Sequence, residues 1–538
     1  MALKRALVLG TAMCMSCGSG DTGSGEPASS GGVDETAAPT TGPAGPTTEP
    51  AGPTTEPASG GESSGAQTSA GSDGGSSTGE PGLPPGPWDA GYAIPETPQA
   101  PGDPVAGYQA MLTRGYVTCG VPYVLFGLTK GLLGDFTKGD PLPGRSGKNA
   151  EVPYNWTVHT PKSGVEIASF NCLECHAGRF NGALVVGLGE ADLDFTDVPM
   201  GALVENLPIL DIFPGGVIGE INKFVERYKA VGPKIKMLTV GTNPADMLAV
   251  ALAAHHNSDT LAWSDEPLLF PPEIMAPVDT PPWWRVHKKH GVFYNGMNRG
   301  DHRGTMMFAS SLCTDSVAEA DEIFEYFDDI NAYIRSLRSP VYPFAIDAEL
   351  AAAGEAVFAA RCAGCHGTYA PAQAGDDGET YPNLLLPLDV IGTDSTVANA
   401  GENYGEMVQW FNESYYGKIV QLEVELPFPG YVAPPLDGVW ATAPYLHNGS
   451  VPTLAALLES DTRPARWRRV DLDSANYDQT TLGWPFIATP YGQDDAPADQ
   501  RKFVYDTSKP GHGNGGHTFG DALDAGERAA LLEYIKTL

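Results

Sequence analysis

Two stretches decide the fold of this 538-residue sequence: Cys172-Leu-Glu-Cys175-His176 and Cys362-Ala-Gly-Cys365-His366. In each stretch, two cysteines three positions apart can reach both vinyl groups of one porphyrin, and the histidine that follows then lies beneath the iron. A zinc site or a redox disulfide also uses Cys-x-x-Cys, but neither requires the adjacent histidine. The motifs therefore predict two covalently bound haem c groups, with His176 and His366 as iron ligands.

Each motif is followed, further along the chain, by a predicted helix with a similar ending. Ser316 and Glu319 can form a capping box, and apolar residues follow at helical spacing up to Leu337. Asp524 and Glu527 begin the second helix in the same way. The two helices end on Ala332-Tyr-Ile-Arg-Ser-Leu337 and Glu533-Tyr-Ile-Lys-Thr-Leu538. This similarity predicts a duplicated unit made of a haem motif and a terminal helix.

A helix is also predicted directly before the second motif. Asp347 can cap it, and Gly354 and Phe358 lie on one stripe of its surface. In the cytochrome c fold this helix crosses the terminal helix, so we expect Gly354 and Phe358 to meet Tyr534. No such helix is evident directly before the first motif, where residues 164–170 are predicted to be a loop or a short strand.

These elements predict a mainly α fold with two cytochrome c-like haem domains and long loops. The first domain is expected at residues 101–340 and the second at residues 341–538. Residues 18–100 are largely Gly, Ser, Thr, Pro and Glu and include a seven-residue repeat. Because this composition has too little apolar area to offset chain entropy, the segment is predicted to be a disordered linker.

Residues 1–17 resemble an export signal, with Lys4 and Arg5 ahead of a short apolar run. Cys17 follows Ser16 as at a lipoprotein cleavage site, with simple cleavage or a lipid on Cys14 as the alternatives. We therefore expect an exported protein that is periplasmic, anchored in the outer membrane as a lipoprotein, or secreted. Membrane contact is expected only through that N-terminal lipid.

The charge balance restricts the partners of this chain. There are 66 Asp and Glu residues against 32 Lys and Arg, a formal charge of -34. Such an acidic chain does not offer the basic surface that nucleic acid or anionic lipid requires. A cationic small redox protein or cytochrome is the expected electron donor or acceptor.

The sixth ligand of each iron determines what the two haems can do, because an open iron face binds peroxide or dioxygen and a closed one only carries electrons. Downstream of the second motif, the candidate ligands are His447, His512 and His517. We favour His517, which lies in a Gly-rich loop before the terminal helix. The candidates for the first iron are Met237, His287, His290 and His302. None has a distinctive context, so we expect no strong protein ligand there.

Two further pairs of residues have alternative roles. Trp283 and Trp284 must face different ways on a regular backbone, so one could lie against a porphyrin or both could be core residues. Cys119 and Cys313 remain once the haem cysteines are assigned. In an oxidising compartment they could form a disulfide or stay as two buried thiols.

The segment Ala433 to Leu454, which contains Pro-Tyr-Leu-His447-Asn-Gly, resembles the bacterial di-haem cytochrome c peroxidase and MauG superfamily. Three other stretches resemble its secreted rubber-oxygenase branch more closely: Arg361–Tyr369, Pro281–Arg285 and Asn298–His302. The resemblance extends over about Tyr108 to Leu538. The distal aromatic residue of that branch has no evident counterpart between Met297 and Phe308.

The resemblance implies two haems with unequal tasks. His176 would bind an iron open to peroxide or dioxygen, and His366 and His517 would hold a six-coordinate iron that passes electrons. His447 would be structural, and Trp284 matches a tryptophan that relays electrons in the rubber-cleaving branch. Trp284 and His302 are our candidate catalytic residues. The sequence thus predicts a peroxidase-like, haem-dependent oxidoreductase, with a non-enzymatic electron carrier and a rubber-oxygenase-like dioxygenase as alternatives.

Overall fold

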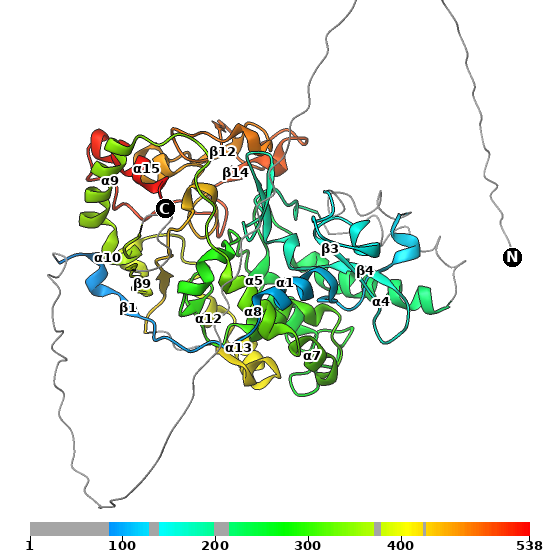
Figure 1. Ribbon diagram of the computed structural model, residues 1–538. Helices are drawn as coiled ribbons and strands as arrows, with labels where there is room; N and C mark the ends of the chain where they lie inside the picture. The colour runs from blue at the N-terminus through cyan, green and yellow to red at the C-terminus, as the bar shows by residue number, and fades with distance from the viewer. Residues whose placement is uncertain (1–84, 128–138, 198–214, 371–377, 423–426) are drawn as a thin grey trace, which may run out of the picture. The chain divides into compact units, whose positions relative to one another are not determined.

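The computed structural model describes residues 85–127, 139–197, 215–370, 378–422 and 427–538 (Figure 1). The predicted export signal at 1–17 and most of the predicted linker at 18–100 lie outside the described residues. Contacts group Gly79–Leu538 into one compact unit. Among the described residues, no helix combines the length and apolar character needed to cross a bilayer.

Helix is the larger share of this unit. The α-helices that the structure describes are α1 (Pro104–Thr113), α4 (Gly215–Val231), α5 (Ala245–Ala254), α6 (Arg303–Phe308), α7 (Val317–Phe324), α8 (Phe327–Ser336), α9 (Ala348–Arg361), α10 (Ala363–His366), α11 (Leu388–Ile391), α12 (Ala400–Asn403), α13 (Gly405–Glu413), α14 (Leu454–Leu458) and α15 (Ala525–Ile535). The 3-10 helices η4 (Cys172–Glu174), η7 (Trp283–Lys288) and η8 (Ala309–Leu312) lie in the segments discussed below.

The strands form small antiparallel sheets. The sheets are β1 (Tyr92–Ala93), β9 (Leu384–Pro387) and β11 (Gly430–Val432); β10 (Val420–Leu422), β8 (Asn298–Gly300) and β7 (Gly291–Val292); β13 (Phe486–Ala488), β12 (Arg466–Arg469) and β14 (Tyr505–Asp506); β2 (Val121–Pro122), β4 (Ile167–Phe170) and β3 (Trp156–His159); and β5 (Ala177–Phe180) with β6 (Ala183–Val186). With 37% helix and 13% strand the structure is mixed, so the mainly α prediction left out the sheets.

The crossing of α9 and α15 agrees with the sequence prediction (Figure 1). A Cβ built on Gly354 would lie 1.9 Å from the Ala530 carbonyl oxygen, which shows how closely the two backbones approach. The Phe358 and Tyr534 rings are 5.3 Å apart. Asp347 caps α9, and Asp524 forms the predicted capping box at the start of α15. These residues build the helix pair that supports the second motif.

An equivalent crossing stands beside the first motif. Helix α1 packs on α8, and a Cβ on Gly107 would lie 1.8 Å from the Asp329 carbonyl oxygen. The Tyr108 and Tyr333 rings are 5.1 Å apart. A crossing helix therefore does precede Cys172, but far upstream of it, which is why no helix was evident directly before the motif. The predicted short strand there is β4, Ile167–Phe170.

The predicted helix ending near Leu337 is two helices, α7 and α8, separated at Glu325 and Tyr326. The Ser316 hydroxyl accepts a hydrogen bond from the Glu319 amide, as expected of a cap. The Glu319 carboxylate accepts from the amide of Asp315 at 2.7 Å, where a capping box would have used the amide of Ser316. The apolar spacing continued through the break, so it could not show where one helix ends.

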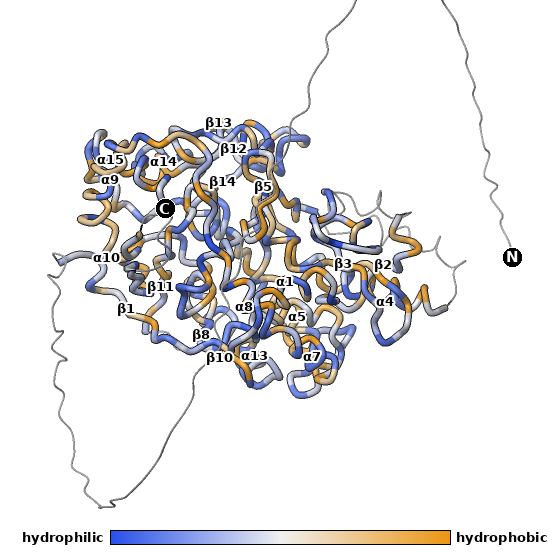
Figure 2. Tube along the Cα trace, in the orientation of Figure 1, coloured by the Kyte–Doolittle hydropathy of each residue, from blue (hydrophilic) through white to orange (hydrophobic). Residues whose placement is uncertain are grey.

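Apolar side chains form one large core and smaller ones. The largest core gathers residues of α1, α4, α5, α8 and α13, and α5 is apolar along most of its length (Figure 2). A second core includes α15 together with Trp284 and Trp440. Two sheets join residues on both sides of residue 340, because β8 pairs with β10 and β1 pairs with β9. The domain boundary at 340 stays a prediction.

Candidate haem-binding sites

The second motif lies at the end of α9 and in α10. The backbone turns there, so the amides of Cys365 and His366 both donate to the Cys362 carbonyl. The His366 ring is fixed by its Nδ1 atom, which lies 2.8 Å from the carbonyl oxygen of Pro434. A carbonyl can only accept, so Nδ1 carries the proton and Nε2 keeps its lone pair for a metal. This arrangement suits an iron ligand.

The His517 ring lies across from that of His366. Their ring centroids are 6.3 Å apart. Two metal–imidazole bonds of about 2.0–2.1 Å, with about 1.1 Å from each nitrogen to its ring centre, would set the centroids roughly 6.3 Å apart. The observed distance therefore fits one metal ion held between the two imidazoles.

The loop that carries His517 is held from both sides. The His517 amide donates to the Ile391 carbonyl at 2.6 Å, and Arg463 donates to the carbonyls of Asn514, Gly516 and His517. Burial, together with the His366 and Arg463 charges, lowers the pKa of His517 to about 3. Burial also lowers the pKa of His366. Both imidazoles are thus neutral at pH 7, which is the form that binds a metal.

His366 and His517 face one cavity, which Cys362 and Cys365 also line. The space in the cavity is about 1390 Å³ when its opening to solvent is included. Its wall is mostly apolar and comes from α9, α11, α14 and α15 among other segments. The lining, the free thiols and the paired imidazoles together fit a haem c group.

His447 also lines this cavity, but it is bound to protein. Its Nε2 atom lies 3.0 Å from the Tyr431 hydroxyl, and the two rings stack 4.2 Å apart. Tyr431 donates its single proton to the Asp394 carbonyl at 2.6 Å, so the Nε2 atom of His447 is the donor in the pair. These contacts support the structural role expected of His447. His512 is buried too, with Nδ1 2.8 Å from the Pro510 carbonyl.

The first motif begins in η4 and ends directly before β5. Its His176 ring stacks on Trp283 with centroids 4.9 Å apart. Burial lowers the pKa of His176 to about 4, and the nearby carbonyl of Pro281 opposes part of that shift. The Nδ1 atom of His176 has no hydrogen-bond partner among the described residues. Among the described residues, no imidazole pairs with His176 as His517 pairs with His366. Within the described ranges, the first site thus offers one imidazole ligand and the second offers two.

Two tyrosines, Tyr116 and Tyr326, lie near Cys172 of the first motif. Burial raises the pKa of Tyr116 well above its ordinary value, and Cys172, Tyr416 and Tyr326 contribute to the shift as neighbours. Tyr116 donates to the Met306 carbonyl at 2.5 Å and Tyr326 to the Gly115 carbonyl at 2.8 Å. This part of the site is therefore enclosed and rich in oxidisable phenols.

Buried carboxyl groups lie around Cys175. Burial raises the pKa of Glu174 to about 8, opposed by a hydrogen bond from Asn155. Burial and the neighbouring Asp192 raise the pKa of Glu190 to about 8 as well. Arg469 pairs with Asp192. Both glutamates are hence largely protonated at pH 7, which limits the negative charge beside the first motif.

The 3-10 helix η7 runs between the two sites. Trp283 contacts His176, whereas Trp284 points elsewhere and donates from Nε1 to the Asp437 carbonyl at 2.8 Å. Arg285 donates to the same carbonyl at 2.9 Å and lines the cavity of His366. Neighbouring residues of one turn therefore touch both candidate haem sites.

His302, the other candidate catalytic residue, is fully buried at the start of α6. Burial, together with the charge of Arg335, lowers its pKa to about 4. Neither ring nitrogen has a hydrogen-bond partner within the described part of the chain. Of the other candidates for the first iron, His290 is engaged by the Ile94 carbonyl at 2.7 Å, and Met237 is buried.

The remaining cysteines form a disulfide. Cys119 and Cys313 are bonded, with Cα atoms 5.4 Å apart. The four motif cysteines are free thiols. The prediction that Cys119 and Cys313 could form a disulfide is therefore confirmed. The cysteines within each haem motif do not form one.

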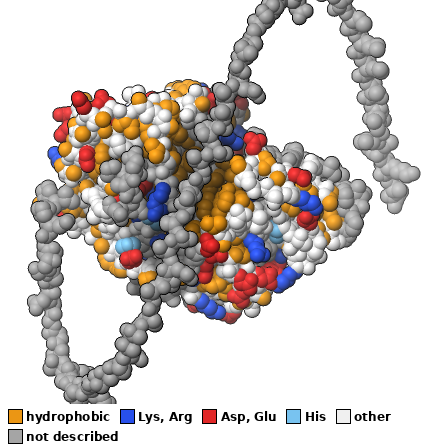
Figure 3. All heavy atoms as spheres, in the orientation of Figure 1, with side chains coloured by type: hydrophobic (Ala, Val, Ile, Leu, Met, Phe, Trp, Pro, Cys, Tyr) orange, Lys and Arg blue, Asp and Glu red, His pale blue; other side chains and the backbone are white. Residues whose placement is uncertain are grey.

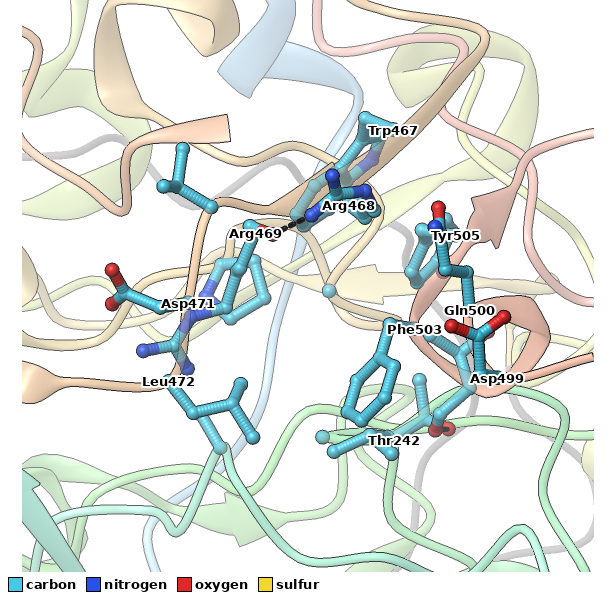
Figure 4. Close-up of a pocket in the computed structure, with 17 residues that line it drawn as sticks. Thr242, Trp467, Arg468, Arg469, Asp471, Leu472, Asp499, Gln500, Phe503 and Tyr505 are labelled. Atoms are coloured by element: carbon cyan, nitrogen blue, oxygen red, sulfur yellow. Dashed lines mark hydrogen bonds between the residues drawn. The ribbon is translucent and has the colours of Figure 1, made fainter. Parts of the chain in front are cut away.

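A separate pocket lies beside β12 (Figure 4). Arg468 and Trp467 stand on one side of it, with Thr242 and Phe503 on the other. Its wall includes acidic as well as basic side chains, and none of the motif residues. The pocket is therefore no part of the haem sites.

Three contacts of the sites were not predicted from the sequence: Trp283 on His176, Pro434 on His366, and Arg285 in the second cavity. Trp283 was recognised as unusual, but sequence spacing could not show which of two adjacent rings meets the histidine. Pro434 lies in the segment that carries the family resemblance. Pro434 stands directly before another proline, and a residue in that position adopts an extended backbone. This was the available signal that its carbonyl could accept a hydrogen bond from a side chain.

Residues 430–468 match the model of the RoxA-like, cytochrome c-like family. The matched segment carries Pro434 and His447, and it implies a haem c protein. The protein y4iJ of Sinorhizobium fredii (strain NBRC 101917 / NGR234), named as uncharacterised, is 30% identical over 344 residues, which are 49% of this chain and 55% of the relative. Protein y4iM of the same organism, also named as uncharacterised, is 30% identical over 243 residues, 38% of this chain and 52% of the relative. The chain spans about half the length of these curated relatives.

Proposed function

We propose that this chain is an exported di-haem c-type oxidoreductase. Peroxide or dioxygen would be activated at the haem attached to Cys172 and Cys175, and electrons would be exchanged through the haem attached to Cys362 and Cys365. The observation that carries the proposal is the unequal surroundings of the two proximal histidines. His366 faces a second imidazole, and the ring beside His176 is a tryptophan.

A haem with one free iron face reacts with peroxide or dioxygen, and a haem with both faces ligated stores or passes an electron. The duplicated helix crossing supports two haem units, since α1 packs on α8 as α9 packs on α15. The four free motif thiols are available for thioether bonds. Together these features favour an enzyme with one reactive and one electron-transferring centre.

The residues of η7 would connect the two sites. Trp283 stacks on His176, and Trp284 and Arg285 are joined to the second site through the Asp437 carbonyl. An indole can be oxidised by one electron, so the Trp283–Trp284 pair is our relay. His302, neutral and buried, could take or give a proton on the reactive side.

Export and an electron partner belong to the same proposal. The Cys119–Cys313 disulfide is typical of an oxidising compartment. Acidic side chains are spread over the visible face (Figure 3), and the net charge of -34 favours a cationic donor protein or cytochrome. The N-terminal lipid would be the membrane anchor.

The proposal is tested by mixing the fully reduced holoprotein with hydrogen peroxide and following both haems by stopped flow. One peroxide should take two electrons and two protons to give two waters, with both haems reoxidised. Trp283→Phe should slow reoxidation of the second haem at least tenfold. Peroxide that leaves both haems reduced, as in a simple electron carrier, would overturn the proposal.

The RoxA-like match favours one second candidate, a dioxygenase that cleaves an apolar polymer. Incubating the holoprotein with polyisoprene and oxygen should then yield aldehyde and ketone products. Absence of these products, with peroxide turnover intact, would leave the peroxidase-like activity as the function.

A further inference from the structure

Three cationic side chains line the cavity of His366 and His517, and one of them, Arg361, is exposed to solvent. Arg285 is only 6% exposed, and its Nη2 atom is buried without a hydrogen-bond partner in the part of the chain that the structure describes. Lys289 follows four residues later and lines the same cavity. The cavity wall is otherwise mostly apolar. Arg285 and Lys289 therefore place two positive charges in a setting that favours neutral groups.

The neighbouring Lys288, in contrast, has ion-pair partners. Its ammonium group pairs with Glu379 and, at 2.6 Å, with Asp437. Within the described ranges, Arg285 and Lys289 form no ion pair within 4.0 Å. Arg285 meets Asp437 only through the backbone carbonyl, at 2.9 Å from Nε. Arg285 and Lys289 are thus without an ion-pair partner among the described residues, whereas Lys288, directly before Lys289, has two.

The one acidic side chain on the cavity wall does not cancel these charges. Burial raises the pKa of Asp279 well above its ordinary value, so the carboxyl group is held toward its neutral form. Burial, with a smaller contribution from the Arg285 charge, lowers the pKa of Lys289 to about 8, so the amine is mostly protonated at pH 7. Buried charges of this kind are costly unless an anion pairs with them.

We propose that Arg285 and Lys289 bind the two propionate carboxylates of the haem that His366 and His517 would hold. This inference rests on the second haem of the proposed function. A guanidinium presents a planar pair of donors that suits a carboxylate, and the lysine supplies a compact second charge. The two propionate charges would offset those of Arg285 and Lys289.

The proposal gives η7 a second role. Arg285 would be fixed by a propionate of one haem, and Trp283 in the same turn stacks on the proximal histidine of the other. Positive charge next to a haem also favours the reduced iron, because reduction removes one positive charge from the centre. Arg285 and Lys289 would therefore raise the reduction potential of the second haem.

The test uses holoprotein carrying Arg285→Gln or Lys289→Gln, with Lys288→Gln as the matched control. Lys288→Gln removes the same charge one residue away, from a cation that already has carboxylate partners. The first readout is the resonance Raman bending band of the propionates, which reports the hydrogen bonds that they accept. The second is a redox titration of the low-spin haem. Neither measurement depends on turnover.

We expect both cavity variants to shift the propionate band and to lower the ratio of reduced to oxidised second haem about tenfold at a given potential, which is about 59 mV for one electron. Lys288→Gln should leave the band in place and change the ratio less than threefold. An unmoved band in Lys289→Gln would overturn the inference even if Arg285→Gln folds poorly, and so would an equal effect of Lys288→Gln.

Failure of the proposed function gives a different result. If peroxide does not react with the first haem, the Raman band and potential of the second haem still report on Arg285 and Lys289. If Cys362 and Cys365 carry no haem at all, the second site of the proposed function and this inference are both overturned.

Discussion

At the scale of single residues, His517 has the clearest role outside the two motifs. Its sequence context, a Gly-rich loop before the last helix, was enough to favour it over His447 and His512. The structure adds the 6.3 Å separation from His366 and the bonds that engage His447 and His512 elsewhere. Loop position could be predicted from the sequence because glycine marks it. The partner of each ring could not, because hydrogen bonds between distant segments leave no local pattern.

His517→Ala should open the second iron. We expect the low-spin signal of that haem to be lost and a new cyanide-binding site to appear, because alanine cannot ligate iron. His512→Ala is the control in the same loop, and its spectrum should match that of the parent protein. A low-spin second haem that persists in His517→Ala would show that another residue is the ligand.

His159 gives a pH prediction that does not involve haem. Burial lowers its pKa to about 4, below the ordinary value of about 6.5. The unfolded chain therefore takes up a proton first as pH falls, and the folded state loses stability between roughly pH 6.5 and 4. At pH 5 the loss should be about 2 kcal/mol relative to neutral pH. Urea unfolding at both pH values should show a loss that is smaller in His159→Asn than in the parent by about this amount, since other buried histidines such as His302 still contribute in both proteins.

At the scale of elements, the paired helix crossings are the strongest evidence for a duplicated unit. The crossing of α9 and α15 could be predicted because Gly354, Phe358 and Tyr534 follow helical spacing close to a haem motif. The crossing of α1 and α8 could not, because α1 lies far from the first motif in the chain. Short strands such as β8 and β10 were also missed, since three-residue strands have no detectable alternation.

Gly354→Ala tests the close approach of the helices. The added methyl would lie 1.9 Å from the Ala530 carbonyl oxygen, so α9 and α15 must separate, at a cost of about 1–3 kcal/mol. Gly405→Ala is the matched control at the start of α13, where a Cβ meets nothing within 4 Å. Thermal unfolding should show a lower Tm for Gly354→Ala alone. Equal Tm values would argue against tight packing at this crossing.

At the scale of the whole molecule, the Cys119–Cys313 disulfide closes a long loop around the first motif. The two cysteines are 194 residues apart in sequence, and cross-linking a loop of this size restricts the unfolded chain by about 4–5 kcal/mol in the chain-entropy model. Replacing both cysteines by serine should lower the free energy of unfolding by an amount of that order. Equal urea midpoints before and after the replacement would contradict it.

The central claim is that one iron is open and the other is closed. An absorption spectrum of the purified ferric holoprotein, recorded with and without cyanide, tests this directly because cyanide binds only to an open iron. We expect cyanide to shift the Soret band of one haem of the two, and to saturate at one cyanide per chain. Two bound cyanides, or none, would contradict the account.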